Sequence, residues 1–238
     1  MRGLWGLRRA VAGHRRWVPT QALRPHSTSL KEIAEEDEKE IFSRHRNIMN
    51  LYELNGNIAP TCWVAPNATV VGDVCLVDKT SIWYGAVVRG DRKSIVLGGY
   101  VSVGDKAVLS TVGKLSTGFP ADIVVGDYTV IEPGAVLTSC RVGYMCVVGA
   151  GAVVGTGCIM RPGSSLQPGS VLPNNTLIPA EEEWGGNPAK KIGKSDPEAN
   201  MLYAESLYDQ MCEHQNEFEP HGMSFKEAEK LRARGHHI

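Results

Sequence analysis

The middle of the chain, from about Ile58 to Pro179, repeats a pattern of hydrophobic and polar residues every six positions. Each block begins with an apolar residue, in most cases continues with Gly, Asp or Pro, and carries a small residue two or three positions after that. The leading side chains are expected to point inward, and the small residues are expected to fill the corners where the chain turns. Blocks assigned to this frame begin at Val71, Val77, Trp83, Leu97, Val103, Val125, Ile131, Val142, Val148, Val154, Met160 and Leu166.

A six-residue period of this kind predicts a β-helix. Each block supplies one short strand and one turn, and three blocks complete a triangular coil of about eighteen residues. Stacked coils bury one continuous apolar column. We therefore predict an all-β fold, a left-handed parallel β-helix of the hexapeptide-repeat kind, over residues 57–180, with flanking N- and C-terminal helices.

Two irregularities interrupt the repeat. Between Leu109 and Ile123 the segment STVGKLSTGFPAD breaks the register and contains two Gly and one Pro, which predicts a loop extruded from a corner of the coil. The block that begins at Leu137 is one residue short before Val142, which indicates a local tightening of the coil.

Charged and amphipathic segments flank the repeat on both sides. Residues 28–56 are assigned to an N-terminal helical extension, because Leu30–Leu54 has apolar residues at mixed helical spacing. Residues 181–238 are assigned to an exit loop and a C-terminal helical tail. The tail helix is expected to begin near Asp196 and to cap or flank the coil, and a second short helix is expected before Gly235. The apolar stripe of the tail helix consists of Met201, Tyr203, Leu207, Met211 and Phe218.

Residues 1–27 are strongly basic. They contain six Arg and no Lys, Asp or Glu, with Leu and Trp side chains interleaved. This composition is typical of a mitochondrial transit peptide, and the alternative is a basic arm that stays attached and contacts a partner or anionic lipid. The rest of the chain holds 19 basic and 26 acidic side chains, which does not fit a nucleic-acid-binding protein. No stretch approaches roughly 18 apolar residues, so any membrane contact is expected to be peripheral.

Cysteine and histidine offer few metal ligands within the repeat. The six cysteines lack CxxC spacing and are expected to be reduced, mostly buried thiols. Cys140, Cys146 and Cys158 are candidate zinc ligands, but Cys146 and Cys158 occupy the small inward position of their blocks, which favours apolar packing. Histidines in the C-terminal tail are expected to be solvated. All seven histidines lie outside the repeat, at His14, His26, His45, His214, His221, His236 and His237.

Two motifs carry a resemblance to a known family. The run SIWYGAVVRGD at residues 81–91 is followed by the exit EWGGNPAK at residues 183–190. In this order they resemble the γ-class carbonic anhydrases and their mitochondrial relatives in respiratory complex I, over roughly residues 55–195. The resemblance implies a trimer in which three histidines between adjacent subunits hold one zinc ion. Such a zinc ion activates a water molecule for attack on carbon dioxide.

The positions that match the zinc ligands of this family carry other residues here. They fall on Ser110, Pro133 and Thr138, and a glutamine near the family's site is replaced by Gly104. The comparison therefore implies no catalytic residue and no metal ligand in this chain. Three positions match the family and are expected at subunit interfaces, with an Arg–carboxylate pair between chains: Arg89, Asp91 and Asp105. Trp83 and Trp184 are expected to pack rather than to catalyse.

The resemblance and the missing ligands together lead to a functional hypothesis. We expect a non-catalytic γ-carbonic anhydrase-like structural subunit in a heterotrimer with other family members, on the matrix side of the mitochondrial inner membrane. Its further partners are expected to be membrane-arm subunits of complex I. No cofactor is expected in this chain, whereas a zinc ion is expected at a neighbouring subunit interface if both neighbours carry their histidines.

Three alternatives remain at this stage. A hexapeptide acyltransferase is compatible with the repeat and with the exit motif, but such enzymes commonly use a coil histidine as general base and the repeat contains none. The others are an active carbonic anhydrase with atypical ligands and an assembly scaffold outside complex I.

Overall fold

The computed structural model describes residues 46–51, 54, 56–118 and 120–217. The chain divides into two units, Met1–Ile41 and Phe42–Ile238, and the described residues all belong to the second. The predictions made for residues 1–27, for most of the N-terminal helix and for the helix before Gly235 lie outside the described residues. So do all histidines except His214.

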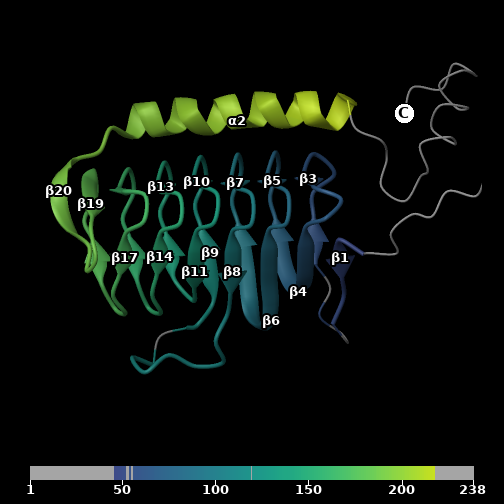
Figure 1. Ribbon diagram of the computed structural model, residues 1–238. Coiled ribbons are helices and arrows are strands. Elements are labelled where there is room, and N and C mark those ends of the chain that lie inside the picture. Colours follow the sequence, from purple (N-terminus) through teal and green to yellow (C-terminus); the bar gives the residue numbers. More distant parts are fainter. Residues whose placement is uncertain (1–45, 52–53, 55, 119, 218–238) are drawn as a thin grey trace, which may run out of the picture. The chain divides into compact units, whose positions relative to one another are not determined.

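The described chain is a β-helix built from short strands that stack in parallel (Figure 1). The hexapeptide-repeat β-helix predicted from the sequence is confirmed. In chain order the strands are β1 (Ile48–Met49), β2 (Asn57–Ile58), β3 (Trp63–Val64), β4 (Thr69–Leu76), β5 (Ser81–Ile82), β6 (Val87–Leu97), β7 (Ser102–Val103), β8 (Val108–Ser110), β9 (Ile123–Val125), β10 (Val130–Ile131), β11 (Val136–Thr138), β12 (Arg141–Val142), β13 (Val147–Val148), β14 (Val153–Val154), β15 (Ile159–Met160), β16 (Ser165–Leu166), β17 (Val171–Leu172), β18 (Leu177–Ile178), β19 (Glu182–Gly185) and β20 (Lys190–Lys194).

Strand pairing divides the coil into three faces. The first face is formed by β6, β8, β11, β14 and β17, and the second by β6, β9, β12, β15 and β18. The long strand β6 turns between them, since it pairs with β8 through Val87–Arg89 and with β9 through Ile95–Leu97. The third face is a separate sheet that runs from β3 through β5, β7, β10, β13 and β16 to β19.

The register shows where the coil changes length. Val147 pairs with Ser165, eighteen residues further on, but Val130 pairs with Val147, only seventeen further on. The tightening predicted after Leu137 is therefore confirmed. Within the coil, the large side chains that are fully buried are Leu76, Ile82, Ile95, Leu97, Leu109, Ile123, Ile131, Leu137, Met160, Leu166, Leu172 and Ile178.

The assigned frame is wrong in its first three blocks, since in the third it is Ile82, not Trp83, that pairs with Val103 and joins the core. Val77 is 41% exposed, whereas the preceding Leu76 is 2% exposed. Val71 is likewise only partly buried, and Val70 is 1% exposed. All three errors occur where two neighbouring residues are apolar, because the period alone does not then say which of them points inward.

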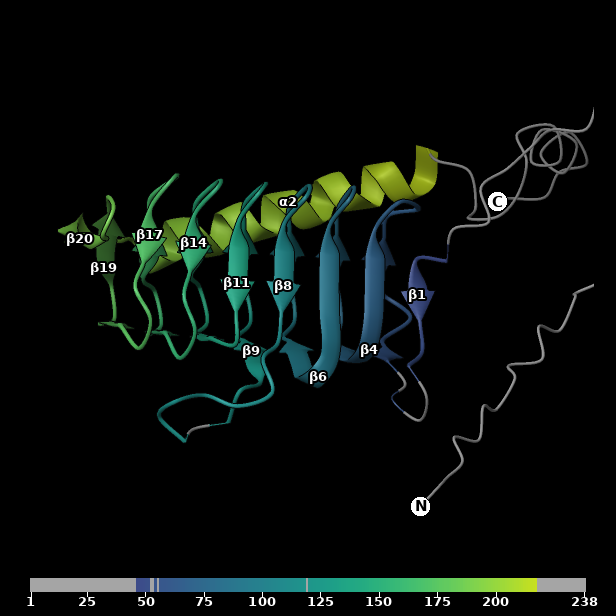
Figure 2. The ribbon, with the colours of Figure 1, turned by 60° about the horizontal axis from the view of Figure 1, so that its bottom comes forward.

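The predicted loop leaves the coil between β8 and β9. Figure 2 shows this segment projecting away from the stacked strands. It is fastened at its base by the buried hydroxyl of Ser139, which accepts a hydrogen bond from Val112 N at 2.8 Å and donates one to Ala121 O at 2.6 Å. The coil therefore holds both ends of the loop.

The C-terminal helix α2 (Pro197–Glu217) lies lengthwise along the coil rather than across its end (Figure 1). It packs on the third face, where it contacts β7 and β10. Ala204 and Met211 are each 1% exposed, whereas Tyr203 is 38% exposed. The predicted stripe is therefore right for Met211 and wrong for Tyr203, and it omits Ala204.

The two ends of the coil differ from the sequence prediction. The exit is not irregular, because β19 extends the third face by pairing with β16 and then forms an antiparallel hairpin with β20. The predicted helix over Leu30–Leu54 is wrong at its end, where β1 pairs with β4. Among the described residues, no helix is long and apolar enough to cross a membrane.

Candidate functional site

The three positions that replace the predicted zinc ligands are divided between two parts of the coil. Ser110 and Thr138 are direct partners in the β8–β11 register, at the ends of their strands on the first face. Pro133 lies in the turn between β10 and β11 and lines a hollow of about 160 Å³ together with residues of α2. One chain therefore places two of the positions side by side and the third at a different corner.

The chemistry of these residues does not fit a zinc site. Zinc in proteins is bound by thiolate, imidazole or carboxylate ligands, whereas Ser110 and Thr138 carry neutral hydroxyls and Pro133 has no donor atom in its side chain. Among the residues that the structure describes, no group of three or more His, Cys, Asp or Glu side chains is placed to hold a metal ion.

The glutamine position of the family is closed by packing of the backbone. A Cβ atom on Gly104 would lie 2.6 Å from Pro133 N and 2.8 Å from the carbonyl carbon of Glu132. Real Cβ atoms do not make contacts this short, so any side chain at position 104 would displace the turn that carries Pro133. Glycine is therefore required here by the close approach of two successive coils.

The three residues that match the family make contacts within the chain. Arg89 Nη2 donates to Asp91 Oδ2 at 2.6 Å, and the Arg89 side chain is 55% exposed. Asp105 Oδ1 accepts a hydrogen bond from Tyr84 N at 3.0 Å and so braces the turn below it. The predicted pairing of Arg89 with a carboxylate of another chain stays a prediction, and the exposed guanidinium has further donors for it.

A histidine reaches the coil from α2. His214 is partly buried, and its Nδ1 lies 3.1 Å from the Tyr84 hydroxyl. Its ring centroid lies 5.0 Å from that of Trp83 and 6.1 Å from that of Trp63, with edge-on geometry in both pairs. The prediction of a solvated side chain is therefore wrong for His214. Its spacing of three residues from Met211 of the apolar stripe is compatible with burial, but this spacing does not identify the residues that His214 contacts on the coil.

The two tryptophans singled out in the sequence have structural partners. Trp83 is 7% exposed, and its Nε1 donates to Ser102 Oγ at 2.9 Å. Trp184 Nε1 donates to Glu182 Oε2 at 2.9 Å, and its ring packs against the core of the coil. These contacts are those of packing residues, as the sequence predicts.

Three cysteines occupy inward corner positions, which was predicted for Cys146 and Cys158. Cys140, Cys146 and Cys158 are each at most 2% exposed, and all six cysteines of the chain are free. Burial raises the pKa of each of these three thiols, since an apolar environment disfavours the thiolate. A neutral thiol is a poor nucleophile and a poor metal ligand. The interpretation of these residues as apolar packing groups is thus supported.

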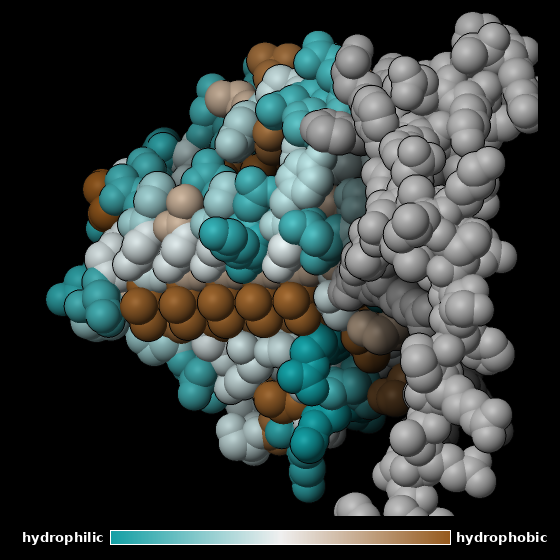
Figure 3. Space-filling view, turned by 45° about the vertical axis from the view of Figure 1, so that its right-hand side comes forward, coloured by the Kyte–Doolittle hydropathy of each residue, from teal (hydrophilic) through white to brown (hydrophobic). Residues whose placement is uncertain are grey.

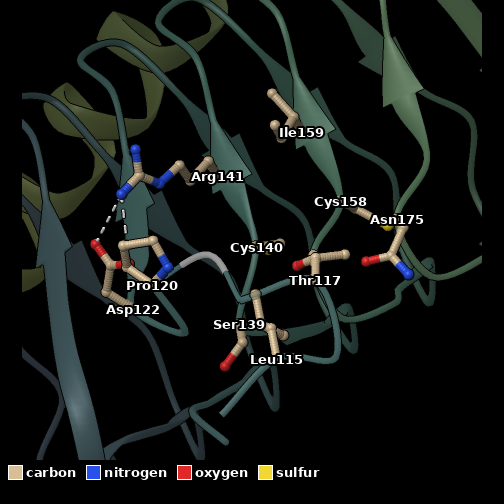
Figure 4. Close-up of a pocket in the computed structure, with 11 residues that line it drawn as sticks. Leu115, Thr117, Pro120, Asp122, Ser139, Cys140, Arg141, Cys158, Ile159 and Asn175 are labelled. Carbon is tan, nitrogen blue, oxygen red and sulfur yellow. Dashed lines mark hydrogen bonds and ion pairs between the residues drawn. The ribbon is translucent and has the colours of Figure 1, made fainter.

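A pocket of about 290 Å³ opens between the extruded loop and the corner of the coil beneath it. Figure 4 shows Thr117 of the loop beside Cys158 and Asn175 of the coil, and Pro120 at the other end of the pocket beside Asp122 and Arg141. At its rim, Arg141 Nη2 lies 3.3 Å from Asp122 Oδ2. Its wall is mainly apolar and neutral. The sequence indicated the loop but not the pocket, because the path of the loop across the coil is not encoded in the repeat.

Comparisons with curated proteins give relatives in Arabidopsis thaliana. The chain is 43% identical to gamma carbonic anhydrase 3, mitochondrial, over 71% of the chain and 65% of the relative. It is 39% identical to gamma carbonic anhydrase-like 1, mitochondrial, over 80% of the chain and 77% of the relative. Gamma carbonic anhydrase 2, mitochondrial, is 32% identical over 82% of the chain and 70% of the relative. The chain thus aligns with about two thirds to three quarters of the length of these plant proteins.

Solved structures share the fold. A hexapeptide transferase family protein from Anaplasma phagocytophilum matches 70% of this chain and 95% of its own length, with a TM-score of 0.61 and 30% identity. A Bacillus cereus protein described as a candidate acetyltransferase matches 71% of this chain and 95% of its own length, with a TM-score of 0.62 and 26% identity. No protein-family model matches the chain.

Proposed function

This chain belongs to the γ-carbonic anhydrase family, and from that premise we propose that it is a non-catalytic structural subunit of a trimeric module. The module is placed on the matrix side of the mitochondrial inner membrane, within complex I, where the chain supports assembly or stability. Its direct partners are other members of the same family, and the membrane-arm subunits of complex I lie next to the module.

One observation carries the non-catalytic assignment. The positions that match the family's zinc ligands hold Ser110, Pro133 and Thr138, which offer no imidazole, thiolate or carboxylate. Zinc-bound water is the nucleophile of this family, so a chain without the ligands lacks the group that lowers the pKa of that water. His214 does not supply a substitute beside Ser110 and Thr138 on the first face, because it packs against Trp83 and Tyr84 from α2, which covers the third face.

The symmetry of a trimer extends this argument to its neighbours. Contacts around a three-fold axis are heterologous, so each chain borders two of the three intersubunit sites. A chain without ligands removes both of these sites. If the two neighbours carry their histidines, about one zinc ion per trimer remains, at the interface between them.

Two independent features support a mitochondrial location. The relatives in Arabidopsis are named as mitochondrial proteins. The first 27 residues carry six Arg and no acidic residue, as in a transit peptide. Placement at complex I rests on the resemblance of the two sequence motifs to its carbonic anhydrase-like subunits.

The test is isolation of the native assembly through an affinity tag on this chain. Native mass measurement is expected to give a trimer that contains family members beside this chain, and metal analysis is expected to give about one zinc per trimer or less. The trimer is expected to co-migrate with complex I. Three zinc ions per trimer, or carbon dioxide hydration by this chain alone that a chelator abolishes, would contradict the proposal.

A second candidate function is acyl transfer. It is favoured by the two solved structures, whose descriptions name transferases and which share 26% and 30% identity with the chain. Calorimetric titration of the purified chain with acyl-CoA distinguishes the two candidate functions. Saturable binding would support this candidate, whereas the structural role predicts none.

A further inference from the structure

The outward side chains of the first face form an apolar column. Figure 3 shows such a row of evenly spaced hydrophobic side chains along the coil. The register aligns one valine from each successive coil, at Val108, Val136, Val153 and Val171. Apolar residues are therefore common at this outward position of the repeat, and a charged residue there requires a reason.

The equivalent column of the second face contains one charged residue. Its register aligns Val96, Val124, Arg141, Ile159 and Leu177. Arg141 Nη2 donates to both carboxylate oxygens of Asp122, at 3.4 Å to Oδ1 and at 3.3 Å to Oδ2. Strong charge-assisted hydrogen bonds are shorter, at about 2.7–2.9 Å. Among the described residues Asp122 is the one acceptor of this guanidinium, so its other N–H donors are available to a ligand.

The Arg141–Asp122 pair forms one end of the pocket of about 290 Å³ beneath the extruded loop (Figure 4). The wall next to this pair is apolar. Leu115 of the loop is 5% exposed, and Cys140 and Cys158 of the coil are at most 2% exposed. An apolar wall with a few polar groups at defined places is the usual composition of a small-molecule site.

The opposite end of the pocket carries neutral polar groups. Thr117 of the loop lies beside Asn175 of the coil (Figure 4). Within the described part of the chain, neither of these two side chains takes part in a hydrogen bond. The pocket is thus apolar in its middle and polar at both ends, which favours an elongated ligand in a fixed orientation.

The charges that line the pocket cancel. Among the described residues, its charged lining residues are Arg141 and Asp122. An anion would therefore meet the carboxylate of Asp122, and a cation would meet the guanidinium of Arg141. Approach of like charges lowers affinity. An uncharged hydroxyl group avoids both costs, because its oxygen accepts from Arg141 while its O–H donates to Asp122.

The volume of the pocket limits the size of its ligand. A cavity of about 150 Å³ holds a molecule of the size of benzene. A pocket of about 290 Å³ therefore has room for roughly ten to twelve non-hydrogen atoms. This is the size of a medium-length chain or of a single substituted ring, and it is too small for a nucleotide.

The pocket is separate from the positions that match the family's zinc ligands. Its lining comes from the loop, from turns, and from β12 and β15 of the second face. Among the described residues that line it, none belongs to a strand of the first face, where Ser110 and Thr138 lie. Pro133 lines a different hollow. The pocket therefore has its own chemistry, which does not involve the zinc positions.

We propose that this pocket binds a small, uncharged and mainly apolar alcohol. The hydroxyl group of the ligand lies between Arg141 and Asp122, and its apolar body lies against Leu115 and the two buried cysteines. Thr117 and Asn175 offer partners to a second polar group at the far end. The inference goes beyond the proposed function, because it concerns this chain alone and requires neither a trimer nor complex I.

The first test is calorimetric titration of the full-length chain with two probes of the same chain length. Octanol is uncharged, whereas octanoate carries a carboxylate in place of the hydroxyl group. Octanol is expected to bind saturably at one site, and octanoate is expected to bind about tenfold more weakly because of Asp122. Absence of saturable octanol binding, or equal affinity for octanoate, would overturn the proposal.

The second test changes the charge of the pocket and keeps its size. Asp122→Asn leaves Arg141 as the charged lining residue, so the affinity for octanoate is expected to rise about tenfold. The affinity for octanol is expected to fall by no more than about threefold, since the amide still offers an acceptor. The control is Asp209→Asn on the exposed side of α2, which is expected to change neither affinity. An unchanged preference for octanol in Asp122→Asn would contradict the role of the ion pair.

The third test uses two matched positions of the same column. Ile159 lines the pocket and is 39% exposed, whereas Leu177, the next residue in the column, is 48% exposed and lies outside the lining. Both variants, Ile159→Gln and Leu177→Gln, are expected to fold, with circular dichroism as the check. Octanol affinity is expected to fall about fivefold in the first, because an amide replaces part of the apolar wall, and to stay unchanged in the second.

Equal effects of these two substitutions would show that octanol binds elsewhere on the coil and would overturn the site. The outcome is independent of the proposed structural role. Failure of octanol to bind leaves the trimer and its zinc content as predicted. Three zinc ions per trimer would instead overturn the structural role and leave this pocket standing.

Discussion

At the scale of single residues, the inward corner positions of the coil show how the repeat selects side chains by size. Cys140, Cys146 and Cys158 occupy the position that Ala135 and Ala152 fill in neighbouring blocks, and all five are at most 2% exposed. A thiol is accepted there because it is small and weakly polar. Its burial nevertheless has a thermodynamic consequence, since the thiol must remain protonated in the folded chain.

The stability of the protein is predicted to depend on the ionisation of Cys140. Burial holds the pKa of this thiol far above its usual range, whereas in the unfolded chain it titrates at about 8.5. Above that pH the unfolded state binds fewer protons than the folded state. The stability contributed by the neutral thiol is therefore fully present below about pH 8.5 and is lost as the pH rises towards the folded pKa, by up to about 1.4 kcal/mol per pH unit.

The measurement is urea denaturation at several pH values between about 7 and 10, for the unchanged chain and for Cys140→Ala. The alanine variant is expected to lose stability less steeply above about pH 8.5. Ala135 and Ala152 show that alanine fits this position, so Cys140→Ala is expected to lower the free energy of unfolding only slightly at pH 7. If the free energies of unfolding of the two proteins changed in parallel over the whole pH range, the raised pKa of Cys140 in the folded chain would be contradicted.

At the scale of elements, the sequence predicted most of the structure that belongs to the repeating coil. It predicted little of the structure outside the repeat. The strands, the tightened block and the extruded loop follow from a period that recurs in every coil. The exit hairpin and β1 do not, since each is formed once and lies outside the six-residue frame. In the same way, the absence of histidine from the repeat was visible in the sequence. The return of His214 to the coil was not, because it joins residues 130 positions apart.

Helix α2 provides the element-scale prediction. Met211 is 1% exposed beneath the helix, whereas Tyr203 is 38% exposed and makes one hydrogen bond, to Glu132 Oε1 at 3.3 Å. Met211→Ala is expected to lower the free energy of unfolding by about 2 to 4 kcal/mol through lost burial and the remaining cavity. Tyr203→Phe is the control and is expected to change it by less than about 1 kcal/mol. Similar values for both variants in thermal or urea unfolding would show that α2 does not pack as described.

At the scale of the whole molecule, the three positions that match the family's zinc ligands lie on two different parts of the coil. The zinc content of the assembly therefore reports how many of its subunit interfaces carry a complete set of ligands. Ser110 and Thr138 lie together on the first face, while Pro133 lies in the turn between β10 and β11. In a ring, the first pair faces one neighbour and Pro133 faces the other. One chain therefore contributes two positions to one site and a single position to the next.

Restoring histidine at these positions is predicted to raise the zinc content in steps. If both neighbours carry their ligands, the unchanged trimer holds about one zinc. The variant Ser110→His/Thr138→His completes one further site and is expected to give about two, and Pro133→His completes the other and is also expected to give about two. The triple variant is expected to give about three, as measured by metal analysis of the purified assembly. The same triple variant, separated from its neighbours, is expected to bind no zinc tightly, because one coil cannot bring the three imidazoles to a single ion. Tight binding by the isolated triple variant would contradict this geometry.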